Sequence, residues 1–247
     1  MDTVLITGAS RGIGRATALQ AADRGWSVAI NYRKDAEAAA KTAEGVRQRG
    51  ARAATIRGDV SLEADVVAMF AKAQADLGPL QGVVINAGIT APAMRLADMS
   101  AERLERMFRV NVLGAYLCAR EAARTLSRSR GGSGGSIVLV SSGAARLGSP
   151  GTYVDYAGSK AALDTLAIGL GKELGAEGVR VNAVRPGLIE TEIHATTGDP
   201  DRARKLGGAT PLGRPGKPEE VAEAIVWLLS DASSYVTGSV LDVAGGI

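Results

Sequence analysis

Tyr156 and Lys160, four residues apart, are the pair in this chain best suited to proton transfer. If the segment is helical, the two side chains lie on one face, one turn apart. An ammonium beside a phenol favours the phenolate and therefore lowers the pKa of the tyrosine. A free tyrosine titrates near ~10, so it needs such a shift to act as a base at neutral pH. The same spacing is also typical of a solvated helix face, so the pair needs support from its surroundings.

A glycine-rich turn close to the start of the chain supplies the first support. An apolar run over 4–7, interpreted as a buried strand, leads into Gly8-Ala-Ser-Arg-Gly12-Ile-Gly14, and a helical stretch and a second strand follow. Strand, glycine turn, helix and strand in this order form the unit that binds dinucleotides. Gly8 permits a tight turn, Gly12 lets backbone N–H groups approach a pyrophosphate, and Gly14 allows close packing. A plain loop is the alternative, because the spacing is not the commoner Gly-x-Gly-x-x-Gly.

Strand-like and helix-like segments alternate along the whole chain. We expect strands at 4–7, 28–32, 53–57, 82–86, 137–141, 179–184 and 240–243, and helices at 12–24, 35–49, 62–77, 100–128, 154–176 and 217–230. This alternation predicts the α/β class: a single domain over 1–247 with a doubly wound parallel sheet of about seven strands, a Rossmann fold with helices on both faces. The Gly- and Pro-rich stretch at about 186–216 is predicted to be a substrate lid.

The composition limits the classes of function. The net charge of +3 fits a phosphorylated cofactor but does not argue for nucleic acid, and one histidine and one cysteine leave no His/Cys metal cluster. No apolar run reaches the ~18 residues needed to span a bilayer, and the first strand follows Met1 too closely for a signal peptide. Because Cys118 is the single cysteine, no intrachain disulfide can form. We therefore expect a cytoplasmic protein without a metal site, a membrane partner or a nucleic-acid partner.

Several motifs, taken together, resemble the short-chain dehydrogenase/reductase family over essentially the whole chain. They are Thr7-Gly8-x-x-x-Gly12-x-Gly14, Asn86-Ala87-Gly88, Asn111, Ser142, Tyr156-x-x-x-Lys160 and Pro186-Gly187. The chain looks most like the 3-oxoacyl-carrier-protein reductase and glucose dehydrogenase-like branches. One departure is Ile85, where the commoner pattern has a first asparagine before Asn86.

The resemblance implies four catalytic residues. Tyr156 resembles the general acid/base, and Lys160 resembles the residue that binds the nicotinamide ribose and lowers the tyrosine pKa. Ser142 resembles the donor that orients the substrate oxygen, and Asn111 resembles the residue that holds a proton-relay water; the alternative for Asn111 is a structural role at a helix kink. Ser141 competes with Ser142, since adjacent side chains on a strand end point opposite ways and only one can face the site.

Two neighbours of the tyrosine carry simpler interpretations. Tyr153 is a second tyrosine, but Ala157 stands four residues after it, where a lysine would be needed. Asp155 is interpreted as a residue of the helix start.

The resemblance also implies a cofactor-binding set along the carboxyl ends of the strands. Its members are Gly8, Ser10, Arg11, Gly12, Ile13, Gly14, Asn31, Arg33, Asp59, Val60, Asn86, Ala87, Gly88, Tyr156, Lys160, Pro186, Gly187, Ile189 and Thr191. Asp59 and Val60 resemble the pair that contacts adenine, and Thr191 resembles the hydroxyl that binds the carboxamide. For Asp59 and Thr191, a helix cap is the alternative role.

Charge after the second strand favours NADP(H) and leaves NAD(H) open. Sites that prefer NAD place a carboxylate there, whereas this chain has Arg33, which can bind a 2′-phosphate in a bidentate manner. Arg11, inside the glycine turn, adds a second cation. Asp35 is close enough to oppose this interpretation but is expected to start the next helix.

The expected activity is hydride transfer between NADP(H) and a carbonyl or secondary alcohol. A 3-oxoacyl thioester or a small ketone is the favoured substrate, and a glucose-type sugar is the alternative. A nicotinamide-binding sensor that has lost catalysis, and a Rossmann-like methyltransferase, are rivals of other classes, but neither explains the tyrosine, lysine and serine together.

Two partners are considered. A homo-oligomer, most simply a tetramer, is expected because the helices 100–128 and 154–176 carry more apolar positions than one sheet face can cover. These positions are Val112, Ala115, Cys118, Ala122, Leu163, Leu166 and Leu170. An acyl carrier protein could dock on a basic face formed by Arg120, Arg124 and Arg128, continued by Arg130 and Lys172. The simpler interpretation of this face is a solvated surface, or ion pairs with Glu121 or Glu173.

Overall fold

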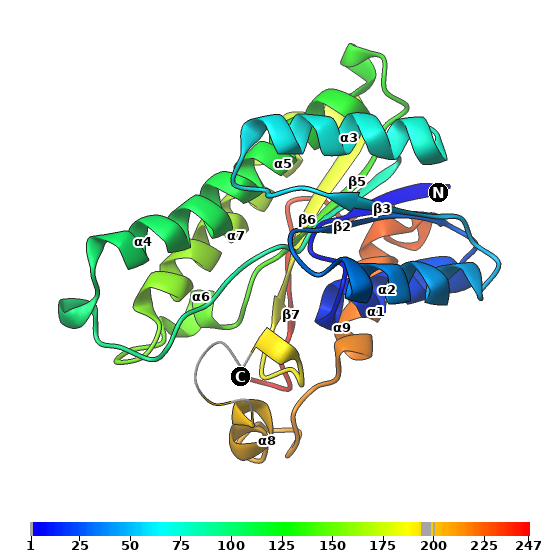
Figure 1. The fold of residues 1–247 in the computed structure, drawn as a ribbon. Coiled ribbons are helices and arrows are strands. Elements are labelled where there is room, and N and C mark those ends of the chain that lie inside the picture. Colours follow the sequence, from blue (N-terminus) through cyan, green and yellow to red (C-terminus); the bar gives the residue numbers. More distant parts are fainter. Residues whose placement is uncertain (1, 194–198, 200) are drawn as a thin grey trace.

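One seven-stranded sheet lies at the centre of the computed structural model, which describes residues 2–193, 199 and 201–247 (Figure 1). All neighbouring strands pair in parallel, in the order β3-β2-β1-β4-β5-β6-β7. The strands are β1 Thr3–Ile6, β2 Ser27–Tyr32, β3 Ala53–Arg57, β4 Gly82–Ile85, β5 Gly135–Val140, β6 Val179–Pro186 and β7 Val240–Val243. The predicted doubly wound sheet and its seven strands are confirmed.

Helices cover both faces of the sheet (Figure 1). They are α1 Gly12–Asp23, α2 Ala36–Arg47, α3 Glu63–Leu77, α4 Ala101–Phe108, α5 Gly114–Leu126, α6 Ala144–Leu147, α7 Val154–Leu174, α8 Arg202–Gly207 and α9 Pro218–Leu229. Residues of α1, α2 and α9 form one apolar core against the sheet, and residues of α3, α5 and α7 form the other. Short 3-10 helices lie at Leu96–Asp98, Arg128–Arg130, Gly175–Glu177 and Asp231–Ser233.

The inner strands are apolar because the sheet is covered on both faces. All four residues of β1 and all four of β4 are buried, as expected for parallel strands between two helix layers. β1 lies between β2 and β4, so the chain reverses its direction of winding there. Ligands of doubly wound sheets bind at such a switch point, beyond the carboxyl ends of the strands.

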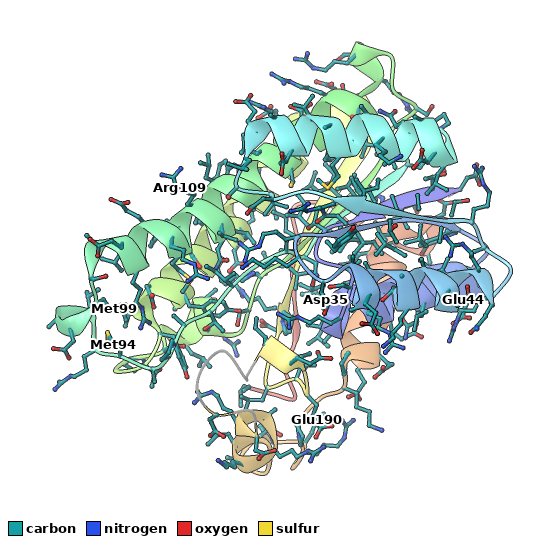
Figure 2. All side chains as sticks on the ribbon, viewed as in Figure 1. Asp35, Glu44, Met94, Met99, Arg109 and Glu190 are labelled. Carbon is teal, nitrogen blue, oxygen red and sulfur yellow. The ribbon has the colours of Figure 1, made fainter. Side chains whose placement is uncertain are left out.

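The segment expected as one helix over 100–128 is interrupted. α4 passes into a π-helical turn, Arg109–Leu113, before α5 begins, and Arg109 marks this junction in Figure 2. Met94 and Met99 lie on the loop that leads into the start of α4 (Figure 2). α5 ends at Leu126, so Arg128 and Arg130 belong to a separate 3-10 helix.

Part of the argument for an oligomer is wrong. Ala115, Cys118, Ala122 and Leu163 are at most 3% exposed and pack inside the core of a single chain. Leu166 and Leu170 are half-buried against the same core. The sheet face therefore covers more of α5 and α7 than the apolar pattern suggested.

Candidate active site

A cleft of about 570 Å³ runs along the carboxyl edge of the sheet. At one end, the cleft is bordered by the glycine turn and by the ends of β2 and β3. At the other end, it is bordered by the ends of β5 and β6 and by the start of α7. Nearly every predicted cofactor-binding residue lines it: Gly8, Ser10, Arg11, Gly12, Ile13, Asn31, Arg33, Asp59, Val60, Asn86, Ala87, Gly88, Tyr156, Lys160, Pro186, Gly187, Ile189 and Thr191. Gly14 is not among the residues that line it.

The glycine turn has the geometry that a pyrophosphate needs. Gly8 and Gly12 have φ angles of +65° and +54°, values that residues with a Cβ rarely adopt. A Cβ on Gly14 would lie 2.6 Å from both the Asn86 side-chain nitrogen and the Gly8 carbonyl oxygen. Backbone N–H groups at the start of α1 therefore border an open cleft, and the chain fits an extended dinucleotide there.

Thr7 and Asn86 fasten this turn to β4. The Thr7 hydroxyl accepts hydrogen bonds from the backbone N–H groups of Asn86 and Ala87 at 2.9 and 3.0 Å. The Asn86 amide in turn donates to the carbonyl oxygens of Thr7 and Gly8. The side-chain amide of Asn86 thus holds the glycine turn in place, and its nitrogen is already hydrogen-bonded to protein carbonyl groups.

Ser142 and Tyr156 face the same end of the cleft. A hydrogen bond joins their side chains, whereas the Ser141 hydroxyl points away and donates to the Lys160 carbonyl at 3.0 Å. The structure thus brings Ser142, and not Ser141, to the tyrosine. Burial raises the pKa of Tyr156 above its ordinary value, and the bond to Ser142 lowers it by a smaller amount. The expected lowering of this pKa by Lys160 is not seen, because the lysine is directed elsewhere.

Lys160 is buried, 4% exposed, and lies under the tyrosine. Its ammonium donates to the Val140 carbonyl at 2.8 Å and lies 5.8 Å from the centroid of the Tyr156 ring. Burial lowers the pKa of Lys160 to about 8, although the negative charge of Asp164 acts in the opposite direction. The lysine therefore loses its proton far more readily than an exposed one.

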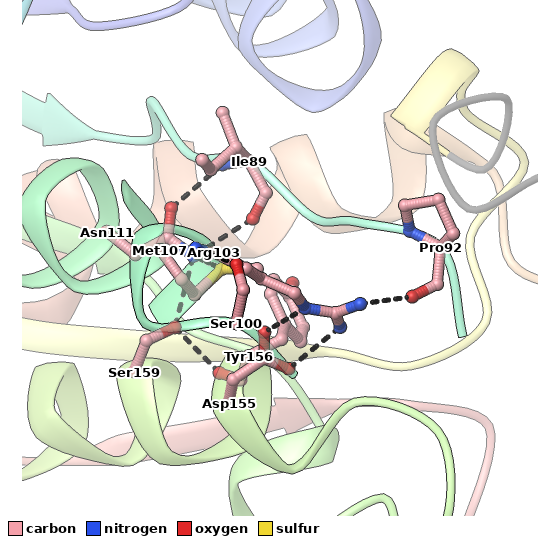
Figure 3. A network of polar contacts seen from close by, with 9 residues as sticks. All are labelled: Ile89, Pro92, Ser100, Arg103, Met107, Asn111, Asp155, Tyr156 and Ser159. Carbon is pink, nitrogen blue, oxygen red and sulfur yellow. Dashed lines mark hydrogen bonds and ion pairs between the residues drawn. The ribbon is translucent and has the colours of Figure 1, made fainter. Parts of the chain in front are cut away.

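Asn111 lies in the π-helical turn and connects the loop after β4 to α7 (Figure 3). Its side-chain oxygen accepts from the Ile89 N–H at 2.8 Å, and its nitrogen donates to the Ile89 carbonyl and to the Ser159 hydroxyl. Ser159 donates to the Tyr156 carbonyl at 2.7 Å. A Cβ on Gly88 would lie 3.4 Å from the Asn111 oxygen and 3.3 Å from the Lys160 nitrogen, so both groups reach the same short segment.

Arg103 and Asp155 form a second connection that sequence reasoning missed (Figure 3). The guanidinium donates to both carboxylate oxygens of Asp155, at 2.9 and 3.3 Å, and to the Pro92 carbonyl at 2.7 Å. The side chains are 12% and 0% exposed. Asp155 does lie in the first turn of α7, as expected, but its partner is far away in sequence and no local pattern identified it.

The opposite end of the cleft holds the charged residues considered for cofactor choice. Arg33 pairs with Asp59 at 3.4 Å, so two of the predicted cofactor-binding residues form an ion pair with each other. Asp35 accepts from the Ala38 N–H at 2.9 Å and caps α2, as expected. The buried side chain of Asn31 accepts from the Gly8 N–H and donates to two carbonyl groups of the β3 end, so it ties the turn to β2 and β3. Asp59 accepts from Ser61, and neither of them caps α3.

The basic face proposed for a carrier protein is largely neutralised by acids. Arg120 lies 2.6 Å from Glu63 and 3.1 Å from Glu121, and Arg124 lies 2.8 Å from Glu121. Arg128 lies outside α5 and contacts the Gly178 turn. The ion-pair interpretation therefore fits this face better than a free docking surface does.

Other kinds of site receive no support from the residues that the structure describes. Among them, no group of three or more His, Cys, Asp and Glu side chains could hold a metal ion. No helix in the described ranges is long and apolar enough to cross a membrane. His194, the single histidine of the sequence, lies outside the described residues.

Comparison with known proteins identifies the family of the chain. Residues 8–247 match a family model described as enoyl-(acyl carrier protein) reductase. An uncharacterised oxidoreductase of Escherichia coli is 51% identical, with 100% of each chain covered. The L-rhamnose 1-dehydrogenase (NAD(P)(+)) of a Sphingomonas species is 43% identical, covering 99% of this chain and 95% of the relative. A short-chain type dehydrogenase/reductase from Mycobacterium marinum has a TM-score of 0.92 at 36% identity, covering 99% of this chain and 94% of that one.

These matches span nearly the whole chain, from the glycine turn to the last strand. The relatives are named as oxidoreductases and dehydrogenases, and the predicted fold agrees with that of the solved structure. The chain is an oxidoreductase and belongs to the short-chain dehydrogenase/reductase family.

Proposed function

We propose that the protein transfers hydride between NADP(H) and a carbonyl or secondary alcohol, with Tyr156 as the general acid/base. The observation that carries this proposal is the shared cleft. The glycine turn lines one end of it, and Ser142, Tyr156 and Lys160 line the other. A cofactor on the turn and a small substrate at the tyrosine can therefore meet within one cavity.

A bound nicotinamide supplies or accepts the hydride. In reduction, the Tyr156 hydroxyl gives its proton to the carbonyl oxygen, and in oxidation the phenolate removes it. The Ser142 hydroxyl donates a hydrogen bond to the negative charge that develops on that oxygen. Lys160, held by the Val140 carbonyl, would bind the ribose of a bound cofactor, and Asn111 holds the loop that borders them.

The preference for NADP(H) rests on charge. Arg33 and Arg11 line the cleft near the end of β2, where a 2′-phosphate would lie. Asp59 opposes them, so NAD(H) is the second choice. One relative is named for NAD(P)(+) and another, from Arabidopsis thaliana, for NADPH.

The favoured substrate is a small ketone or a 3-oxoacyl thioester, with sugars as the second candidate. The sugar alternative draws on relatives named as L-rhamnose and glucose dehydrogenases. A carrier-linked thioester is the weaker form of the first candidate, because Arg120 and Arg124 already have acidic partners. A cytoplasmic location is part of the proposal, since the single cysteine, Cys118, is buried and free.

A direct assay tests the proposal. Purified protein is mixed with NADPH or NADH and a panel of small ketones, 3-oxoacyl thioesters and, in the oxidised direction, aldoses. Cofactor absorbance is followed. Turnover of at least one ketone or thioester, faster with NADPH, is expected. If only aldoses are turned over, the sugar alternative replaces the proposed substrate class. If no compound of any class is turned over, the proposed function is wrong.

A further inference from the structure

The three basic residues of α8 have different partners. Arg204 lies 2.9 Å from Glu190 and Lys205 lies 2.7 Å from Asp199, so each pairs with an acid. Arg202 instead places its guanidinium carbon 5.1 Å from the centroid of the Tyr153 ring, within the range of a cation–π contact. Among the described residues no carboxylate forms an ion pair with it; Asp199, bound to Lys205, attracts it only from a distance.

Arg202 and Tyr153 belong to the substrate end of the cleft. Both line it together with Ser142 and Tyr156. Tyr153 is only 8% exposed and directly precedes α7, three residues before the proposed acid/base. Arg202, next to Tyr153, and the Tyr156 side chain therefore border the same end of one cleft.

The acids that line the described part of the cleft belong to its other end. Asp35 caps α2 and Asp59 pairs with Arg33. The Glu192 carboxylate lies beside the glycine turn, 3.6 Å from where a Cβ on Gly12 would be. The cleft is also lined by apolar and hydroxyl side chains, among them Leu147, Ser149, Leu188 and Ile193. An anion at this position would therefore meet a guanidinium, and the described acids would not repel it from close by.

We propose that Arg202 binds a carboxylate on the substrate, so that the enzyme acts on short oxo acids or the matching hydroxy acids in preference to neutral ketones. This inference rests on the proposed function and names its substrate class. A guanidinium binds a carboxylate through two parallel hydrogen bonds, and such charge-assisted bonds are the stronger kind. Stacking on Tyr153 holds the guanidinium plane in place before the substrate arrives. Because Arg202 and Tyr156 line the same end of the cleft, we expect short acids, with one or two carbons between carbonyl and carboxylate.

The test compares levulinate with its methyl ester, which has the same carbonyl and no charge. The variant is Arg202→Gln, and the matched control is Arg204→Gln, which removes a charge from the same helix outside the cleft. We expect wild-type kcat/KM to be at least about tenfold higher for levulinate than for the ester. Arg202→Gln should lose most of that ratio, with a rise in KM for levulinate, while Arg204→Gln keeps it.

The ester also separates the two proposals. If wild type reduces the ester as well as levulinate, or if Arg202→Gln changes both substrates equally, the carboxylate inference is wrong while the reductase proposal stands. Arg202→Lys provides a further check, because it keeps the charge without the bidentate geometry and should restore only part of the ratio. If wild type turns over neither compound, acetoacetate, which has one carbon between carbonyl and carboxylate, is compared with its methyl ester in the same way. Failure of both pairs would overturn the inference.

Discussion

At the scale of single residues, Tyr156 carries the proposed proton transfer. We predict that Tyr156→Phe lowers kcat by roughly 100- to 10,000-fold, the range that a positioned acid/base contributes, while NADPH still binds. Tyr153→Phe is the control, because it keeps the ring that lines the cleft. Steady-state kinetics and fluorescence titration with NADPH check both statements. If Tyr156→Phe stays active while Tyr153→Phe is inactive, the assignment of the proton transfer to Tyr156 is wrong.

The buried Lys160 predicts a pH-dependent stability. Its pKa is lowered from 10.5 to about 8 in the folded chain, so between these values the unfolded chain binds more protons than the folded one. Stability must then rise with pH across this window. Relative to Lys160→Met, the protein without cofactor should gain about 2 kcal/mol from pH ~7.5 to ~9.5, at 1.36 per pKa unit. Urea unfolding at both pH values measures this, and a constant difference between the two proteins would show that Lys160 titrates normally.

Arg33 tests the cofactor preference. Loss of a charge-assisted hydrogen bond costs roughly 1.5–3 kcal/mol, so Arg33→Ala should weaken NADPH by about tenfold or more and NADH little. Arg57→Ala is the control, because Arg57 ends the neighbouring strand β3 and is not among the residues that line the cleft. Equal losses for both cofactors in isothermal titration would contradict the assignment.

The sequence was a better guide to which residues lie at the site than to the contacts that those residues make. The alternation of side chains at a strand end left one of Ser141 and Ser142 for the site, and the structure places Ser142 beside Tyr156. The pKa of Tyr156 was misjudged, because helical spacing brings Lys160 under the ring but cannot show that its ammonium is bound by the Val140 carbonyl.

At the scale of elements, two connections join the loop after β4 to the start of α7. Asn111 holds Ile89 and, through Ser159, Tyr156. Arg103 holds Pro92 and Asp155. Most of the longer helices were predictable from periodicity and caps, but the π-helical turn and the short helices α6 and α8 were not. An extra residue in a helical turn leaves the apolar pattern nearly intact, and Asn111 in this turn pairs with a loop that is distant in sequence.

The Arg103–Asp155 pair should be strongly non-additive. Arg103→Gln leaves a fully buried carboxylate without its partner, which costs about 3–5 kcal/mol. Arg103→Met combined with Asp155→Leu removes both charges and should be more stable than Arg103→Gln alone. Lys72→Gln, which breaks an exposed pair with Asp76, should cost at most about 1 kcal/mol. Urea unfolding measures these three variants and the single variants Arg103→Met and Asp155→Leu. A double variant as destabilised as the sum of Arg103→Met and Asp155→Leu would show that the two residues act independently.

At the scale of the whole molecule, exposed apolar side chains remain on the helices α4, α5 and α7. Phe108, Leu113 and Tyr116 are 44–45% exposed on α4, on α5 and in the turn between them, and Ile168 is 39% exposed on α7. α4 and α5 both contact α7 and the turn between them, so these residues come from neighbouring elements. They replace Ala115, Cys118 and Leu163 as the reason to expect association, because they are the apolar groups that a single chain leaves in water.

We predict a homotetramer in which two copies pair these helices across a two-fold axis. Light scattering at micromolar concentration should give about four times the 25.3 kDa mass of one chain. Tyr116→Glu combined with Ile168→Glu places charges where apolar groups should meet and should lower the measured mass. Val67→Glu is the matched control, because Val67 is 45% exposed on α3 and lies outside these three helices. Wild type with the mass of one chain, or a mass that falls equally in the control, would contradict the predicted interface.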